Sequence, residues 1–122
     1  NARQHKVEIE FVKTNLIEDL DFESDRNYLL GANLPYIDHA LRSSLDPEVV
    51  NFEPHLALFA ENKGLALHHR LIAMLKQKGV NYLLIGEIAP EQEKLLKEKY
   101  PEMTFLKDYA GKVRFYTLPC SV

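Results

Sequence analysis

The feature that most constrains the fold is an apolar run over residues 79–86, whose central side chains do not alternate between polar and apolar. A strand of this kind is buried on both faces of a sheet, because neither of its sides is polar. A helical pattern precedes the run, and a charged helical segment and two short β-like runs follow it. This order predicts an α/β domain with a small mixed sheet that is flanked by helices and ends in a β-hairpin.

The pattern before this strand predicts a helix over residues 65–78, with apolar residues on one side. Lys76 and Lys78 stand in its last turn, where positive charges favour the helix dipole. Gly79 then fits the C′ position, which commonly takes a left-handed conformation.

A second helix is predicted to begin at Pro90 and to end before Pro101, since proline suits only the first turn of a helix. The two β-like runs over residues 103–106 and 113–118 are expected to pair as a hairpin. We expect Gly111, in the connecting loop, to have a positive φ, which glycine adopts without steric cost.

The N-terminal half has two longer patterns. Residues 5–13 alternate between apolar and charged side chains, which predicts a half-buried strand. Residues 25–45 carry apolar side chains every three to five positions, which favours a helix with a break near Gly31. Pro35 would then lie in the first turn of the second helical segment.

Between these halves, Asp46 and Pro47 indicate a turn. Short apolar runs over residues 49–52 and 56–60 read as strands, with a bend at Pro54. The polar residues 61–64 are expected to form a loop before the helix.

The 122 residues suffice for one domain with its own core, and we expect residues 1–122 to form a single α/β domain. The net charge of -3 excludes a basic nucleic-acid-binding surface as the main feature of the chain. Cys120 is the single cysteine and cannot form a disulfide within the chain. We also expect the domain to be excised from a longer protein, with residues 1–2 as an expression scar.

Two places could carry chemistry. Glu53 and His55 are two residues apart and would share one side of a continuous strand, where they could share a proton or a metal ion. Gly64 precedes a helix, but the surrounding sequence matches neither glycine-rich phosphate-binding motif. No complete metal, nucleophile or cofactor motif is present, so we expect no catalytic residue, no metal site and no cofactor. The candidate binding surface comprises Glu53, His55, Glu61, Asn62, Lys63 and Gly64.

Five segments of the chain match the rhythm of a known family: residues 46–50, 54–59, 78–85, 100–102 and 111–116. On these segments, residues 46–118 resemble the soluble C-terminal domain of multi-spanning bacterial glycosyltransferases, the dolichyl-phosphate-mannose-protein mannosyltransferase-like group. The resemblance implies a non-catalytic domain at the extracytoplasmic face of a bacterial cytoplasmic membrane. Its partners would be the membrane-spanning part of the same polypeptide and a glycan or protein acceptor, with no nucleic acid.

Two alternatives remain open at this point. One is a small-molecule-sensing α/β domain of a bacterial regulator, located in the cytoplasm, in which residues 64–86 form part of a Rossmann-like unit. The other is a hydrolase that uses Glu53 and His55.

Overall fold

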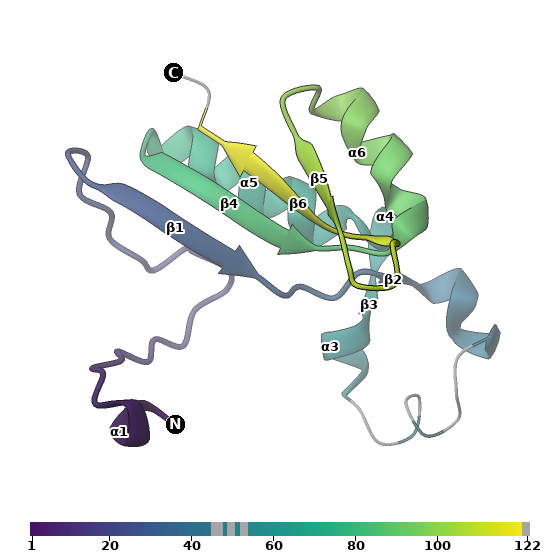
Figure 1. Cartoon of the computed structure of the whole chain (residues 1–122), viewed down its shortest axis with the longest axis horizontal. Helices are drawn as coiled ribbons and strands as arrows, with labels where there is room; N and C mark the ends of the chain where they lie inside the picture. Colours follow the sequence, from purple (N-terminus) through teal and green to yellow (C-terminus); the bar gives the residue numbers. More distant parts are fainter. Residues whose placement is uncertain (45–47, 49–50, 52–53, 121–122) are drawn as a thin grey trace.

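The computed structural model describes residues 1–44, 48, 51 and 54–120, and a four-stranded sheet forms its centre (Figure 1). The strands follow the order β1-β4-β6-β5 across the sheet. β1 is parallel to β4, whereas β4–β6 and β6–β5 are antiparallel pairs. The strands span Asn27–Ala32 (β1), Asn81–Glu87 (β4), Thr104–Lys107 (β5) and Val113–Pro119 (β6). The sheet is mixed and ends in a hairpin, which confirms the predicted fold class.

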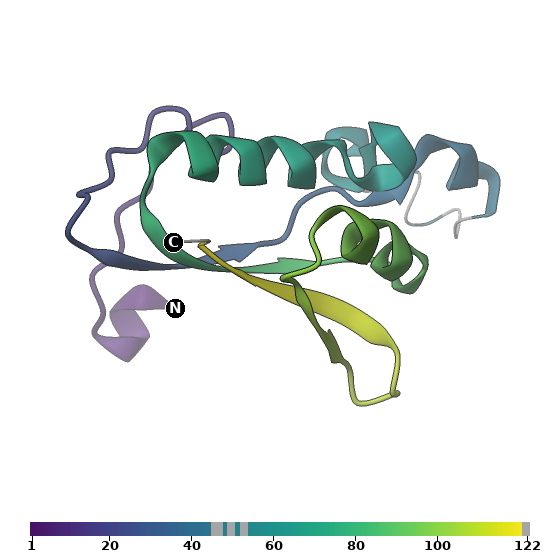
Figure 2. The same cartoon turned by 90° about the horizontal axis from the view of Figure 1, so that it is seen from above.

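Helices cover one face of this sheet (Figure 2). They are α5 (Ala66–Lys78) and α6 (Glu93–Lys99), the latter preceded by the 3₁₀ turn η2 (Pro90–Gln92). Buried side chains of these helices and of the sheet form one hydrophobic core, which includes Leu75, Leu84, Leu96 and Tyr116. The helices predicted over residues 65–78 and from Pro90 to before Pro101 are confirmed, as is the left-handed Gly79 after α5, with φ 63°.

β4 is buried on one face only. Tyr82 and Leu84 point into the core, whereas Leu83 on the opposite face is 40% exposed. The prediction that this strand is covered on both faces is therefore wrong for the part of the chain that the structure describes. The outer face of this strand carries the apolar Leu83 and Ile85 between the polar Asn81 and Glu87, and these residues are exposed or only partly buried.

Gly86 in β4 lies directly beneath the aromatic ring of Tyr116 from the neighbouring strand, so a Cβ atom there would collide with the ring. A glycine within a strand marks such a close approach. The hairpin β5–β6 forms as predicted, and Gly111 in its loop has a φ of 77°.

The N-terminal half differs from the prediction. Residues 5–13 form no strand: a short helix α1 (Ala2–His5) is followed by extended chain without regular structure. A segment with an alternating pattern forms a strand only when a neighbouring strand pairs with its backbone N–H and C=O groups. No described residue pairs with residues 5–13 in this way.

The described part of the predicted helical region, residues 25–44, does not form the two predicted helical segments. These residues contain β1, the two-residue strand β2 (Ile37–Asp38) and the 3₁₀ helix η1 (His39–Ser44). Short apolar runs are compatible with a helix or a strand. Residues 27–32 form a strand because they pair with β4.

The segment before α5 also differs. Residues 56–60 are divided between a short helix α3 (His55–Leu58) and the strand β3 (Phe59–Ala60), which pairs with β2. The expected loop at residues 61–64 is a distorted helical turn, α4 (Glu61–Gly64). The predicted turn at Asp46 and Pro47 lies outside the described residues, as does nearly all of the predicted strand at 49–52.

Candidate functional site

The carboxyl ends of the parallel strands β1 and β4 lie side by side, because Ala32 is paired with Gly86. Asn33, Leu34, Pro35 and Tyr36 continue from β1 at this edge, and Glu87 ends β4. In open α/β sheets, ligands bind beyond the carboxyl ends of the strands. This edge is therefore the first place to look for a functional site.

Tyr36 forms the centre of a polar cluster at this edge. Its hydroxyl donates a hydrogen bond to Glu87 Oε1 at 3.1 Å. Arg114 donates to the same carboxylate at 3.1 Å and to the Tyr36 hydroxyl at 3.4 Å. The Arg114 guanidinium also lies 5.9 Å from the centre of the Tyr36 ring. Side chains from the segment after β1, from β4 and from β6 thus fix the ring and its hydroxyl.

The cluster also controls the protonation of Tyr36. Burial raises the pKa of Tyr36 above its usual value, the Glu87 carboxylate raises it further, and Arg114 opposes this effect. The phenol therefore keeps its proton at neutral pH and donates a hydrogen bond to Glu87.

A buried amide holds the backbone of the same segment. Gln92 Nε2 donates to the carbonyl of Tyr36 at 2.7 Å and to the carbonyl of Lys63 at 2.8 Å. Its Oε1 accepts from the backbone N–H of Ala89 at 2.9 Å. One side chain of η2 thereby links the segment after β1 to α4.

Gly64 is required where α4 meets this segment. It is buried and has a φ of 80°, and a Cβ atom would collide with the carbonyl of Tyr36. A residue with a side chain would be strained here and would also displace Tyr36.

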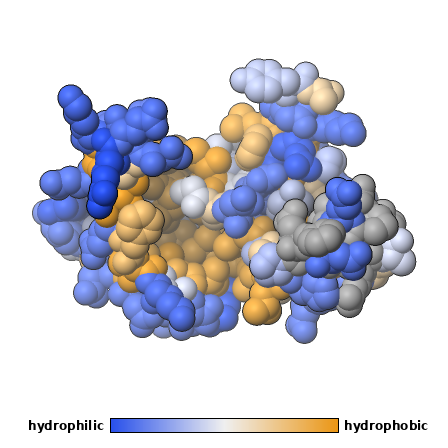
Figure 3. All heavy atoms as spheres, turned by 90° about the horizontal axis from the view of Figure 1, so that it is seen from below, coloured by the Kyte–Doolittle hydropathy of each residue, from blue (hydrophilic) through white to orange (hydrophobic). Residues whose placement is uncertain are grey.

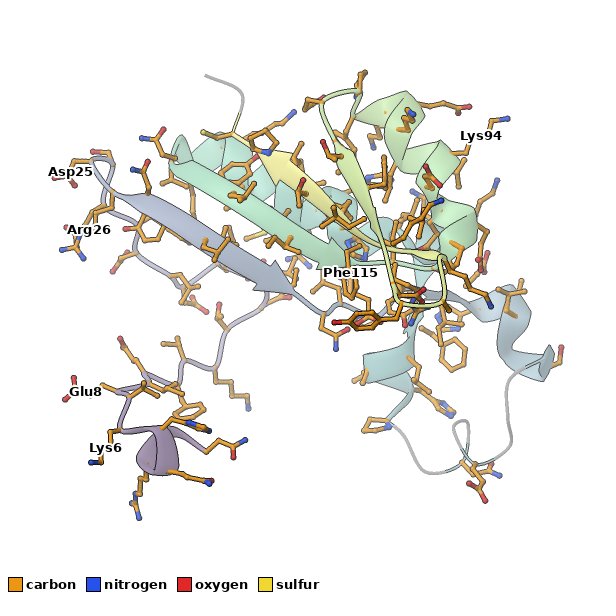
Figure 4. The ribbon with its side chains drawn as sticks, viewed as in Figure 1. Lys6, Glu8, Asp25, Arg26, Lys94 and Phe115 are labelled. Atoms are coloured by element: carbon orange, nitrogen blue, oxygen red, sulfur yellow. The ribbon has the colours of Figure 1, made fainter. Side chains whose placement is uncertain are left out.

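Two cavities flank Tyr36. The smaller, of about 200 Å³, is lined by Asn33, Leu34, Tyr36, Ile37, Ala57, Leu58 and Glu87. The larger, of about 570 Å³, lies between residues 36–41 and the segment from Ala89 to Leu95, with Lys63 at its border. The larger cavity is mostly apolar and carries charged side chains at its rim, including Asp38, Glu91 and Lys94; Figure 4 shows Lys94 on α6.

The structure places the sequence-derived candidates as follows. Lys63 and Gly64 lie beside the Tyr36 cluster through their backbones, and Glu61 and Asn62 precede them in α4. His55 is exposed in α3, where its ring packs edge-on against Phe59. Glu53 lies outside the described residues, so the structure does not test the pairing with His55.

Sequence reasoning missed Asn33, Tyr36, Glu87, Gln92 and Arg114. The sequence carried a signal for two of them, Glu87 and Asn33. An acidic residue, Glu87, directly follows the most apolar run of the chain, and a polar Asn33 follows the run at 28–32. Reading residues 25–45 as a helix hid the second signal, because a helix would not bring Asn33 to the end of a strand.

The chain is similar to bacterial methyltransferases over 93% of its length. It is 37% identical over 121 residues to a release factor glutamine methyltransferase of Enterococcus faecalis, and 33% identical over 123 residues to that of Staphylococcus aureus. It is also 32% identical over 122 residues to a bifunctional methyltransferase of Rickettsia conorii. The chain spans 43%, 44% and 23% of these relatives, respectively. No protein-family model matches it.

These relatives correct the function inferred from the sequence. The resemblance to a membrane glycosyltransferase domain is wrong, and with it the non-catalytic role, the membrane-spanning and acceptor partners and the extracytoplasmic location that it implied. The alternative of a sensor domain is wrong for the same reason. Among the described residues, no helix has the length and apolar character needed to cross a bilayer.

Proposed function

We propose that this chain is part of a methyltransferase that modifies the side-chain amide of a glutamine in a release factor. The observation that carries the proposal is the similarity over nearly the whole chain to several enzymes named for this activity. Since the chain spans less than half of those enzymes, the activity belongs to the complete polypeptide. Such an enzyme meets its substrate in the cytoplasm, where translation takes place.

The smaller cavity suits a glutamine side chain. A primary amide offers two N–H donors and one carbonyl acceptor, and the amide of Asn33 is complementary to it on both counts. Asn33 is exposed and makes no hydrogen bond to the other described residues, so its amide is available. Tyr36, held by Glu87 and Arg114, would form the wall against which the glutamine packs.

In the reaction, a carbon–nitrogen bond forms between the methyl group and the amide nitrogen. The bond from the methyl group to its donor breaks, with its electron pair staying on the donor, and one N–H proton passes from the nitrogen to solvent water. The side-chain carbonyl oxygen of Asn33, which lines the cavity, would accept a hydrogen bond from an N–H of the amide and so orient the nitrogen.

The methyl donor does not fit the same cavity. Sites for ligands of nucleoside size or larger have volumes of about 300–1,000 Å³, and the cavity beside Asn33 has about 200 Å³. We therefore assign no donor-binding role to these residues. The larger cavity on the other side of Tyr36 would receive residues of the release factor that flank the glutamine.

The test uses the complete product of the gene that encodes this chain, a release factor and S-adenosylmethionine as the methyl donor. Mass spectrometry of the release factor measures the addition of one methyl group to a glutamine. Replacing Asn33 by Ala should lower kcat/KM on the order of 100-fold, because one positioning hydrogen bond to the reacting amide is lost.

Asn27→Ala is the matched control, since Asn27 lies at the opposite end of the same strand. It should leave the rate within about twofold of the wild type, in line with a surface substitution far from the site. The proposed function is wrong if the complete wild-type protein adds no methyl group. The assignment of the site is wrong if both asparagine variants lose activity equally.

A further inference from the structure

Residues 108–112, which join β5 to β6 and which we call the tip loop, lie at the same edge of the sheet as the candidate site. Phe115, near the start of β6, is paired with Glu87 at the end of β4, and the two strands are antiparallel. The tip loop therefore lies beyond the carboxyl end of β4, on the edge that carries Tyr36. Figure 2 shows it projecting from the sheet on the side away from α5.

Hydrogen bonds within the tip loop hold it in one conformation. Asp108 Oδ1 accepts from the backbone N–H of Ala110 at 2.9 Å and from that of Lys112 at 3.0 Å. The backbone N–H of Asp108 donates to the carbonyl of Lys112 at 2.8 Å, and the N–H of Gly111 donates to the carbonyl of Asp108 at 3.0 Å. A loop that is already ordered loses little conformational entropy when a partner binds it.

Tyr109 stands in this ordered loop without any role in the described fold. Its side chain is fully exposed and makes no hydrogen bond or ring contact with the other described residues. The core and the hairpin therefore do not require an aromatic residue at this position. Tyrosine is one of the side chains that contribute most to binding at protein interfaces, because it is large and rigid and carries a hydroxyl group.

Two lysines flank Tyr109. Lys107 ends β5 and Lys112 ends the tip loop, and both are exposed. Neither forms an ion pair with another described residue. The carboxylate between them, that of Asp108, accepts hydrogen bonds from the backbone of the loop. The tip loop therefore presents an aromatic ring between two positive charges, which is complementary to a protein surface that carries acidic side chains.

The tip loop is separate from the apolar surface of the sheet. Figure 3 shows the molecule from the side on which β1 forms the edge of the sheet, where apolar atoms gather in a hollow between two hydrophilic rims. The tip loop belongs to β5 and β6, at the other side of the four-stranded sheet. A single exposed aromatic side chain is common on protein surfaces. Tyr109 differs because an ordered loop holds it at the edge of the candidate site.

We propose that the tip loop is a docking contact for the release factor, with Tyr109 as its anchor and with Lys107 and Lys112 facing acidic side chains of that protein. The inference rests on the proposed function, because the release factor is the partner only if the complete enzyme methylates it. A folded protein that inserts one glutamine beside Tyr36 brings the surrounding surface against the same edge of the sheet, where the tip loop projects. The tip loop binds this surface, whereas the cavity binds the glutamine.

The experiment measures kcat and KM of the complete product of the gene with two substrates, the release factor and a short peptide that contains the same glutamine. Tyr109→Ala should raise KM for the release factor on the order of 10-fold and leave kcat within about twofold, because a contact far from the reacting atoms is equally strong before and during the reaction. The kcat/KM for the peptide should not change, since the peptide lacks the surface that meets the tip loop. Tyr109→Phe keeps the ring and should restore the KM of the wild type.

A second pair of variants tests the charges and the specificity of the effect. Replacing Lys107 and Lys112 together by Ala should raise KM for the release factor and make it depend less on salt concentration, because salt screens attraction between exposed charges. Gln77→Ala is the control, since Gln77 is exposed in the last turn of α5, near the amino end of β4 and thus at the opposite edge of the sheet. It should change neither constant with either substrate.

The outcomes separate this proposal from the proposed function. If the complete wild-type protein methylates neither substrate, the proposed function is wrong, and the partner named here is wrong with it. If methylation is normal and Tyr109→Ala leaves KM for the release factor unchanged, only the docking contact is wrong. Equal losses with the release factor and the peptide would place the effect of Tyr109 in the site itself and would also overturn the contact. An unchanged KM together with Tyr109-dependent binding of single-stranded RNA would assign the tip loop to RNA instead.

Discussion

At the scale of single residues, Gln92 shows how a buried polar group organises the site. It is almost fully buried, and both of its amide hydrogens and its carbonyl oxygen have backbone partners. A buried amide whose donors and acceptor are all hydrogen-bonded lowers the stability of the folded state little, whereas a buried amide without partners destabilises it strongly. Gln92 therefore holds Tyr36 and Lys63 in fixed positions.

Replacing Gln92 by Glu should destabilise the protein by about 3 kcal/mol, because a carboxylate would face two carbonyl oxygens that lose their donor. Thermal or denaturant unfolding measures the effect. The same change at the exposed Gln77 in α5 is the matched control and should change stability by no more than about 0.5 kcal/mol. Equal effects at the two positions would show that the Gln92 hydrogen bonds contribute nothing.

His68 is a second buried polar residue, and it makes stability depend on pH. Its Nδ1 atom lies 3.1 Å from the Tyr116 hydroxyl, and its Nε2 atom has no partner among the described residues. Burial, together with the neighbouring His69, lowers the pKa of His68 to about 4. The pKa of His69 is also lowered, by burial and by Lys99.

Between pH 6.5 and about pH 4 the unfolded chain binds a proton at this position and the folded chain does not, so stability should fall as the pH decreases through this window. The loss due to His68 should be about 3 kcal/mol and should be complete below pH 4. Unfolding curves of the wild type and of His68→Gln at several pH values measure it. The free energy of unfolding of His68→Gln should depend less steeply on pH than that of the wild type, and the dependence that remains is due to His69. The control variant, His5→Gln, should have the same pH dependence as the wild type.

At the scale of secondary-structure elements, the packing of β4 against β6 depends on a glycine opposite an aromatic ring. The ring of Tyr116 lies over Gly86 and is completely buried there. A side chain at position 86 would push the ring away and separate the two strands that carry Glu87 and Arg114.

Gly86→Ala should therefore lower the free energy of unfolding by about 1–3 kcal/mol, the usual cost of overpacking. Gly31→Ala is the matched control: it lies in β1, and a Cβ atom there would meet nothing within 4 Å. That variant should be as stable as the wild type or more so, since alanine reduces the entropy of the unfolded chain. If both variants were equally stable, the close approach of Tyr116 would be refuted.

At the scale of the whole molecule, one core on one side of the sheet supports the structure, and the other side is open. Leu84 and Leu83 are neighbours in sequence but point to opposite faces: Leu84 is 0% exposed and belongs to the core, whereas Leu83 is on the open face.

Leu84→Asp should abolish cooperative unfolding of the 122-residue chain, since a carboxylate cannot be buried in the core without a partner. Leu83→Asp in the same chain should keep the cooperative transition with a shift below about 1 kcal/mol. Circular dichroism during thermal unfolding distinguishes the two. A cooperative transition in Leu84→Asp would place β4 outside the core.

By itself, the sequence determined the C-terminal half of the fold. Residues 65–118 carry strong local signals, namely the helical stripe of α5, the left-handed Gly79, Pro90 at the start of a helix and Gly111 in the hairpin, and the structure has each where it was predicted. These features depend on contacts within a few residues, which the local sequence specifies.

Only the tertiary structure decided the N-terminal half and the site. Residues 27–32 became a strand because β4 was available for pairing, and residues 7–12 did not because the described chain offers no partner. The site residues come from three separate parts of the sequence, namely Asn33 and Tyr36, Glu87 and Gln92, and Arg114, and these parts meet only when β1 lies beside β4 and β6. Pairing between strands and contact between side chains far apart in the chain depend on the whole fold, and no local pattern encodes them.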